Sequence, residues 1–380
     1  MNKRGSSWNG LGGRLSGTMF PRGVSLGTSV RRQKDMKYKI DVLCNDGSPL
    51  GVTEQSIFGL DGRNGVGGAE LALLTLCRGL YDRGHKVVLY NNPSMSGGSV
   101  FQQESIDSFV PSDDRDAVIV FRSPNGRITP DTKGRIIWWS CDQYTIGDFA
   151  EFSTKVDDVV CISPHHAEYF KTFYNICDAE VIGIPVRTWE YKNIKNKKRN
   201  ACIFTSVPSR GAIELLPIWS KIIEQIPDAS LTITSDWSLW SGEDVSGSVS
   251  PFRMSWAGKP NVNYVGAIKR DELIKIQSEA EFHLYPCIYD ELFCISVAES
   301  QVAGVFPITS TMGALETTNR FGRRISGNPM SAEFIRNFVD TTVRLMQEEK
   351  RLDISYGAEG VFGLDAALDQ WADLFERCHD

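Results

Sequence analysis

Two glutamates in the second half of the chain flank the expected start of a helix. Glu291 follows the strand-like run 281–285, and Glu299 lies eight positions later, within the helical pattern of 294–303. A carboxylate in such a loop can accept hydrogen bonds from sugar hydroxyls, and one a turn or more into the helix can reach a ribose diol. The spacing of the two acids therefore favours a site for a nucleotide that carries a sugar.

The residues between these two acids would bind the diphosphate of such a ligand. The first N–H groups of a helix have no partner within the helix and form a binding site for anions. Here those groups belong to Phe293, Cys294, Ile295 and Ser296. One short segment would thus contact the sugar, the diphosphate and the ribose.

An arginine in the segment 204–211 is the expected cation of the site. The segment reads FTSVPSRG, which is typical of a strand end, a turn and the start of a helix. A guanidinium at Arg210 would offset the negative charge that grows on a departing diphosphate. The alternative is an exposed arginine that happens to precede a helix.

A glycine-rich turn in the first half of the chain is the other candidate for close contact with a ligand. Gly67 and Gly68 lie at the start of the expected helix 68–83, where the lack of a Cβ would let the backbone approach a donor phosphate or an acceptor. The spacing in 65–70 does not match the G-x-G-x-x-G pattern of dinucleotide-binding turns. A tight turn with a purely structural role remains the alternative.

Four short runs in consecutive order resemble the signature of one enzyme family. They are Tyr-Pro at 285–286, ELFCIS at 291–296, AESQVAG at 298–304 and GALE at 313–316, and they include the family's pattern of Glu, seven residues, Glu. This text resembles the retaining glycosyltransferases of the GT-B fold, often called glycosyltransferase family 4. The resemblance extends over roughly residues 37–350.

The resemblance implies a role for each candidate residue. Glu291 would bind the sugar hydroxyls, Glu299 the ribose, and Arg210 together with the amides of 293–296 the diphosphate, while Asp142 would lie near the acceptor. It further implies transfer of a hexose-type sugar with retention of configuration, a donor such as a UDP- or GDP-sugar, and neither a cofactor nor a metal. The acceptor, whether a glycan, a lipid-linked glycan, a protein or a small molecule, is not identified by the sequence.

The chain departs from the family pattern at two places. Thr205 or Ser206 stands where many relatives have the first of two basic residues, and Cys141, before Asp142, stands where they have a histidine. These departures keep open a catalytically inactive module that binds nucleotide sugars. An epimerase of nucleotide sugars on the same architecture is the second alternative.

Apolar strand patterns alternate with helical patterns along the whole chain, which predicts an α/β protein of parallel βαβ units. We expect two Rossmann-like domains that face each other across a cleft, since ligands bind such sheets beyond the carboxyl ends of their strands. The expected strands are 37–44, 86–90, 117–122, 135–140, 158–163, 201–205, 230–234, 262–265, 281–285 and 305–309, and the expected helices are 68–83, 164–174, 211–226, 270–279, 294–303 and 365–378.

The polar, lysine-rich segment 187–200 interrupts this rhythm and predicts the connection between the domains. The acceptor-side domain would then span 36–190 and the donor domain 200–360. The last residues, 365–380, would complete one of the two, and 1–35 would form a disordered basic arm.

Charge and cysteine content exclude several other classes of protein. The net charge of −6 argues against a nucleic-acid partner, because such proteins need a basic surface. The nine cysteines include no C-x-x-C pair, which favours neither a zinc site nor a disulfide framework and fits a reducing compartment. We therefore expect a cytoplasmic protein, with peripheral membrane contact through the basic arm as an alternative.

Overall fold

The structure is a computed structural model and describes residues 37–44, 51–63, 65–192, 197–234, 251–348 and 353–377. The basic arm expected at 1–35 lies outside these residues, as does 193–196 in the expected connection. No helix in the described ranges is both long and apolar enough to cross a membrane.

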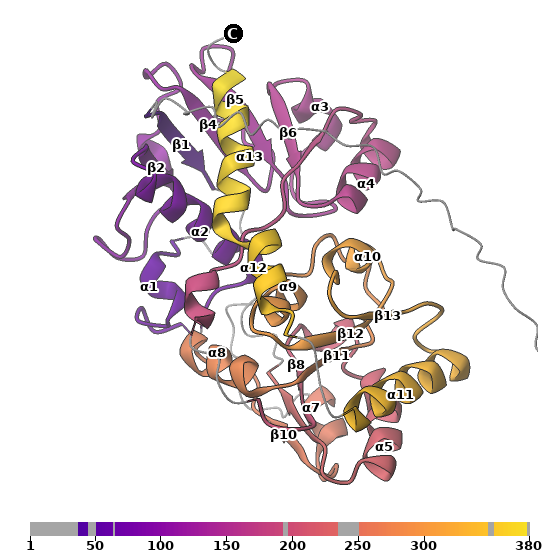
Figure 1. Cartoon of the computed structure of the whole chain (residues 1–380). Coiled ribbons are helices and arrows are strands. Elements are labelled where there is room, and N and C mark those ends of the chain that lie inside the picture. The colour runs from indigo at the N-terminus through magenta and orange to yellow at the C-terminus, as the bar shows by residue number, and fades with distance from the viewer. Residues whose placement is uncertain are drawn as a thin grey trace, which may run out of the picture. The chain divides into compact units, whose positions relative to one another are not determined.

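The first half of the chain forms a seven-stranded parallel sheet in the order β3-β2-β1-β4-β5-β6-β7 (Figure 1). Between the strands run four helices and a short 3₁₀ turn. The strands are β1 (Lys39–Leu43), β2 (Lys86–Tyr90), β3 (Gln102–Glu104), β4 (Ala117–Phe121), β5 (Arg135–Trp139), β6 (Asp158–Cys161) and β7 (Glu180–Val181), and the helices are α1 (Glu54–Ile57), α2 (Gly68–Asp82), η1 (Ile106–Ser108), α3 (Phe149–Ser153) and α4 (Pro164–Tyr174).

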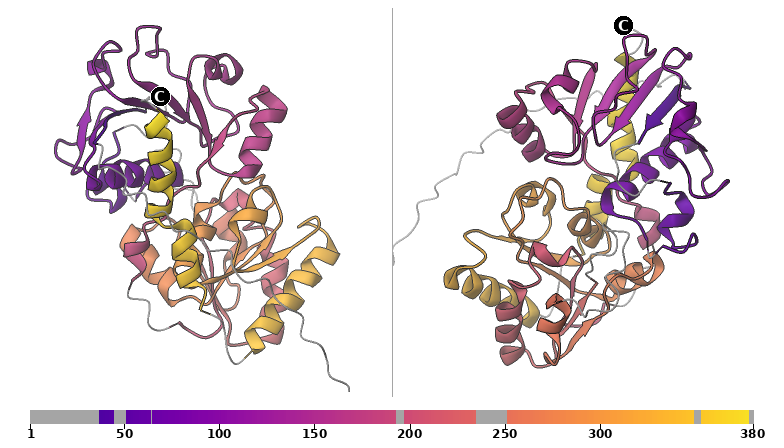
Figure 2. Two further views of the ribbon diagram at one scale, coloured as in Figure 1. Left: turned by 45° about the horizontal axis from the view of Figure 1, so that its top comes forward. Right: turned by 180° about the vertical axis from the view of Figure 1, so that it is seen from behind.

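The second half forms a six-stranded parallel sheet in the order β10-β9-β8-β11-β12-β13, and α5 and α11 lie side by side against it (Figures 1 and 2). Two 3₁₀ turns, η2 (Thr188–Tyr191) and η3 (Pro208–Arg210), precede and follow its first strand. The strands are β8 (Ala201–Phe204), β9 (Ser230–Ile233), β10 (Val262–Tyr264), β11 (Phe282–Tyr285), β12 (Phe306–Ser310) and β13 (Arg323–Ile325), and the helices are α5 (Leu215–Gln225), α7 (Pro251–Trp256), α8 (Arg270–Glu279), α9 (Ile295–Val302), α10 (Leu315–Thr318), α11 (Ala332–Gln347), α12 (Ser355–Phe362) and α13 (Leu364–Glu376).

The expected α/β fold with two parallel sheets is confirmed. In each sheet the strand order reverses once, between β1 and β4 in the first and between β8 and β11 in the second. At such a point the loops that follow the two central strands diverge to opposite faces and leave a crevice beyond the carboxyl ends. The candidate site residues follow β5, β8 and β11, so the topology places them at these edges.

The helix at the end of the chain packs against the first sheet and its helix α2. The indole of Trp371 lies edge-on to Trp139 in β5, with ring centroids 5.6 Å apart. On the outer side, Arg83 pairs with Asp365 and Asp369 at 3.4 and 2.7 Å. Helix α13 therefore contributes to the core of the first half although it lies at the far end of the sequence (Figure 1).

All ten expected strands are present, but the start of one helix was predicted wrongly and three short strands were not predicted. The helix expected from Gly211 begins instead at Leu215, because Gly211 has φ +131°, outside the helical region, and a 3₁₀ turn precedes it. Pro217 is then the third residue of α5, in the first turn, where its missing N–H leaves no helix bond unmade. The short strands β3, β7 and β13 were missed because two or three mostly polar residues show no strand pattern.

A buried histidine in β11 should make the fold sensitive to acid. The side chain of His283 has no exposed surface, its Nδ1 lies 2.9 Å from Ser300 Oγ, and burial lowers its pKa to about 3. An unfolded histidine titrates near 6.5. Below that pH the unfolded chain therefore takes up a proton that the folded chain does not, and the free energy of unfolding falls as the pH falls.

We expect His283→Asn to abolish the part of this pH dependence of the unfolding free energy that comes from His283. For the parent, the histidine should lower the free energy of unfolding by about 2 kcal/mol between pH 7 and pH 5. Urea unfolding of both proteins at the two pH values measures the difference. The same loss in parent and variant would contradict the assignment of a neutral His283.

Candidate functional site

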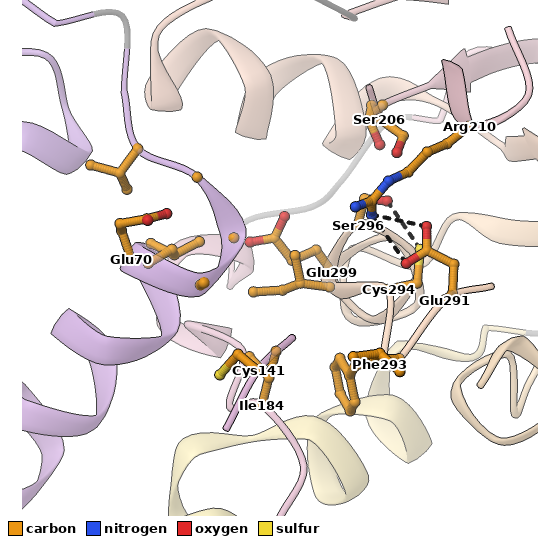
Figure 3. Close-up of a pocket in the computed structure, with 18 of the residues that line it drawn as sticks. Glu70, Cys141, Ile184, Ser206, Arg210, Glu291, Phe293, Cys294, Ser296 and Glu299 are labelled. Atoms are coloured by element: carbon orange, nitrogen blue, oxygen red, sulfur yellow. Dashed lines mark hydrogen bonds and ion pairs between the residues drawn. The ribbon is translucent and has the colours of Figure 1, made fainter. Parts of the chain in front are cut away.

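The residues predicted for the site meet in one cavity of about 250 Å³. Loops at the carboxyl ends of both sheets form its walls, with the starts of α2 and α9 among them (Figure 3). All ten predicted residues line it: Gly67, Gly68, Asp142, Arg210, Glu291, Phe293, Cys294, Ile295, Ser296 and Glu299.

Glu291 is a buried acid of the cavity that two other side chains hold. It follows β11 and is only 3% exposed. Its Oε1 accepts a hydrogen bond of 2.5 Å from the hydroxyl of Tyr285. Both carboxylate oxygens lie 3.1 Å from Nη1 of Arg210 (Figure 3). The carboxylate is thereby fixed in one orientation.

The loop after β12 supports the backbone of Glu291. The amide of Ala314 donates to the carbonyl of Glu291 at 2.6 Å. Gly313 has φ +56°, and a Cβ at that position would lie 2.3 Å from the same carbonyl oxygen. Only glycine fits there, because any side chain would displace the acid.

Arg210 lies over the ring of Tyr289, with its guanidinium carbon 4.2 Å from the ring centroid. Burial by itself would lower the pKa of Arg210, but the charge of Glu291 beside it holds the pKa above its ordinary value. The sequence predicted separate roles for the two residues, on the diphosphate and on the sugar. In the structure the cation and the acid bind each other.

Helix α9 begins at Ile295, one residue later than expected, with Cys294 as its N-cap at φ +67°. The amides of the first turn lie at the wall of the cavity, where the positive end of the helix dipole favours an anion. Burial raises the pKa of Cys294 to about 12. Its thiol therefore remains protonated at neutral pH and adds no negative charge at this position.

Glu299 lies within α9, and its Oε1 is 2.7 Å from Nη2 of Arg270. Both side chains are buried. Sequence reasoning missed Arg270, because an arginine in the first turn of an expected helix gives no local sign that it is buried. The structure thus provides a second cation at the cavity, in addition to Arg210.

The glycine-rich turn of the first half approaches the start of α9. Gly67 is the N-cap of α2 and Gly68 its first residue. A Cβ at Gly68 would lie 2.8 Å from Cγ2 of Ile295, and one at Gly67 would lie 2.4 Å from Oε2 of Glu70. Two helix N-termini therefore face the same cavity from the two halves of the chain.

Asp142 is bound by an arginine that the sequence did not single out. Arg122 follows β4 with φ +71°, and its guanidinium forms ion pairs with Asp142 and, at 3.1 Å, with Glu70. A non-glycine residue in the left-handed region is strained, and such strain is concentrated at functional sites. The only sequence signal was an arginine at the end of a fully apolar strand.

Cys141, which precedes Asp142, lines the cavity as well. Burial raises the pKa of its thiol well above the ordinary value. The nearby His166 is also buried, and its pKa is lowered to about 3. Both groups are therefore neutral near pH 7, and neither provides a charge of its own.

The two halves also touch beside Glu291. Asp290 accepts a hydrogen bond of 2.9 Å from Nε2 of Gln143 and lies 2.8 Å from Nε2 of His165. In the ranges that the structure covers, no three His, Cys, Asp or Glu side chains are grouped so as to hold a metal ion.

Comparisons with known proteins agree with this architecture. No family model and no curated protein matches the sequence. Among solved structures, AviGT4, a glycosyltransferase involved in avilamycin A biosynthesis, is 16% identical with a TM-score of 0.64 over 90% of this chain and 98% of its own. The chain has the GT-B fold.

Two further structures with this fold were solved with nucleotides. The catalytic domain of starch synthase IV from Arabidopsis thaliana, bound to ADP and acarbose, is 10% identical with a TM-score of 0.64 over 90% of this chain and 99% of its own. Alr3699/HepE from Anabaena, in complex with UDP-glucose, is 13% identical with a TM-score of 0.60 over 90% and 100%. At these identities the likeness concerns the fold.

The pair of Arg210 and Glu291 should couple measurably in stability. Changing Arg210 to Gln leaves the buried Glu291 without its counter-charge, and we expect a cost of about 2–3 kcal/mol of unfolding free energy. Changing Glu291 to Gln leaves Arg210, whose side chain is 28% exposed, and should cost less, about 1–2 kcal/mol. The double variant should cost less than the sum by about 1–2 kcal/mol. Urea unfolding of the parent, the two single variants and the double variant measures these costs. Strictly additive costs would show that the pair does not interact.

Proposed function

We propose that the protein is a retaining glycosyltransferase that moves a hexose-type sugar from a nucleotide-sugar donor to an acceptor without a metal. One observation carries this proposal: Glu291 and Glu299 lie on either side of the start of α9 in a single cavity, with Arg210 bonded to the first of them. This order of groups matches the order of sugar, diphosphate and ribose in a donor.

The balance of charge in the cavity suggests how the donor is held. Among the described residues, four carboxylates line it, Glu70, Asp142, Glu291 and Glu299, against three guanidinium groups, Arg122, Arg210 and Arg270, so that these side chains together carry one net negative charge. A diphosphate must then rely on the helix starts and on an arginine that changes partner.

Arg210 is the arginine placed to make that exchange. It sits at the end of the segment before α5, and its one carboxylate partner at ion-pair distance, among the described residues, is Glu291. In our proposal the diphosphate takes the guanidinium, and the released carboxylate binds the sugar hydroxyls. Tyr285 keeps Glu291 in place throughout, because its hydroxyl bonds Oε1 independently of Arg210.

The transfer step then needs little from a protein base. The bond from the anomeric carbon to the phosphate oxygen breaks, and its electron pair leaves with the diphosphate. The acceptor hydroxyl bonds to that carbon on the same face, and its proton passes to the departing phosphate oxygen. Arg210 and the first amides of α9 stabilise the charge that develops there, which is the largest contribution in most reactions of this kind.

Asp142 would orient the acceptor in this mechanism, with Arg122 holding its carboxylate. The neutral thiol of Cys141 and the neutral ring of His166 support a route that uses no histidine as a base. The nucleotides named for the two neighbours, ADP and UDP-glucose, support a nucleoside-diphosphate donor.

A thermal-shift screen tests the donor. UDP-, GDP- and ADP-glucose are each added to the protein, and the correct base should raise Tm by several degrees at ligand concentrations ~100 times Kd, because the ligand binds only the folded state. Donor converted to another sugar nucleotide with no acceptor present would instead support an epimerase. A Tm that none of the three raises would count against the donor site.

The role of Glu291 is tested by transfer rates. We expect Glu291→Gln to lower kcat at least ~100-fold, because the variant loses a charged contact made to the sugar in the transition state. Glu316→Gln is the matched control, since Glu316 is exposed and does not line the cavity. Transfer by Glu291→Gln at the parent rate would remove this residue from the mechanism. Donor binding without turnover in the parent would indicate an inactive binding module.

A further inference from the structure

Four buried charges of alternating sign run from the connection between the two sheets to the cavity. Arg187 pairs with Glu190 at 2.6 Å, Glu190 with Arg270 at 2.7 Å, and Arg270 with Glu299 at 2.7 Å. Each of the four side chains is at most 7% exposed. The row begins just after β7 and ends at the acid expected to bind ribose.

The members of this row come from three separate segments. Arg187 and Glu190 belong to the connection, where Glu190 lies in η2. Arg270 is the first residue of α8, and Glu299 lies in α9. Arg270 and Glu299 line the cavity, whereas Glu190 does not. Glu190 therefore reaches the cavity through Arg270, and its neighbour Tyr191 reaches it through Gln277.

The geometry of Arg270 requires an arginine. Its Nε and Nη2 donate hydrogen bonds to Oε2 of Glu190 at 2.9 and 2.7 Å, and the same Nη2 forms an ion pair with Oε1 of Glu299 at 2.7 Å, a contact of charge without hydrogen-bond geometry. The planar guanidinium can bind two carboxylates at once in fixed directions, which the single ammonium of a lysine cannot do. The hydroxyl of Tyr191 lies 3.4 Å from the same Nη2 and donates to Gln277 at 2.7 Å.

Stability alone does not account for such a row. Taking four charges out of water is costly, and apolar side chains of similar size would often serve the core as well or better. What the row provides is a fixed orientation of the Glu299 carboxylate. Arg270 holds the Oε1 side of Glu299, and the carboxylate faces the cavity toward the start of α2 (Figure 3).

We propose that Arg270 and Glu190 are positioning residues for the ribose of the donor. Arg270 fixes the carboxylate of Glu299 so that it accepts hydrogen bonds from the ribose diol, and Glu190 fixes Arg270. The connection between the sheets thus contributes to donor recognition without touching the donor. This inference rests on the proposed function, in which Glu299 binds ribose.

The test compares nucleotides with and without the ribose hydroxyls. The full chain is titrated in a calorimeter with UDP, GDP and ADP, and with the 2′,3′-dideoxy form of each. For the nucleotide that binds, the affinity of the ribose form divided by that of the dideoxy form gives the ratio to be compared. In the parent we expect the ribose form to bind ~10–100 times more tightly, as for hydrogen bonds to a charged group. In Glu190→Gln and in Arg270→Lys the ratio should fall to within ~3-fold, with the affinity for the dideoxy form unchanged.

Two further variants keep the result interpretable. Tyr191→Phe removes only the hydroxyl that contacts Arg270, so it should fold and lower the ratio about 2-fold. Asp41→Asn disrupts another buried pair, with Arg115 at 2.6 Å in the first sheet and outside the cavity. It should lose stability but keep the ratio of the parent.

Each outcome bears on a different claim. A parent that binds no nucleotide would contradict the proposed function itself. A parent that binds both forms equally would remove Glu299 from ribose recognition and overturn the inference. If Glu190→Gln folds and keeps the parental ratio, the row has only a structural role and the inference is overturned. If Glu190→Gln does not fold, an unchanged ratio in Tyr191→Phe overturns the inference in the same way.

Discussion

Seven charged side chains in the described part of the chain share one cavity, and the need to pair each of them constrains the rest of the site. Each guanidinium bonds at least one carboxylate: Arg122 binds Asp142 and Glu70, Arg210 binds Glu291, and Arg270 binds Glu299. A buried charge without a partner is far more costly than a paired one. The loops that carry these residues must therefore hold their geometry closely, and in the proposed function a diphosphate binds by taking Arg210 from Glu291.

The topology of the sheets explains why these charged side chains gather at one cavity. Arg122, Asp142, Arg210 and Glu291 follow four different parallel strands, β4, β5, β8 and β11, and all parallel strands of a sheet end at the same edge. Two helices, α2 and α9, begin at the same cavity, and the positive ends of their dipoles lie at its wall. The net negative charge of the side chains is thus set against the positive ends of two helices.

Local patterns were enough to predict most elements of the fold, and together with the resemblance they named ten residues that line one cavity. Buried parallel strands are short apolar runs, and amphipathic helices show their period, so neighbouring residues alone reveal them. The residues that were missed have partners far away in the sequence. Arg122 follows an apolar strand and Arg270 begins a polar helix, and nothing beside either one indicates a carboxylate 52 or 29 positions away.

The sequence by itself determined the class of fold, the order of its elements and the identity of the groups around the start of α9, because each depends on residues close together in the chain. Only the tertiary structure decided which charges bind each other. It joined Arg210 to Glu291, and it tied Glu299 through Arg270 to Glu190 in the connection. The physical reason is that an ion pair depends on distance in space, and the distance between distant segments is set by the packing of whole sheets and helices.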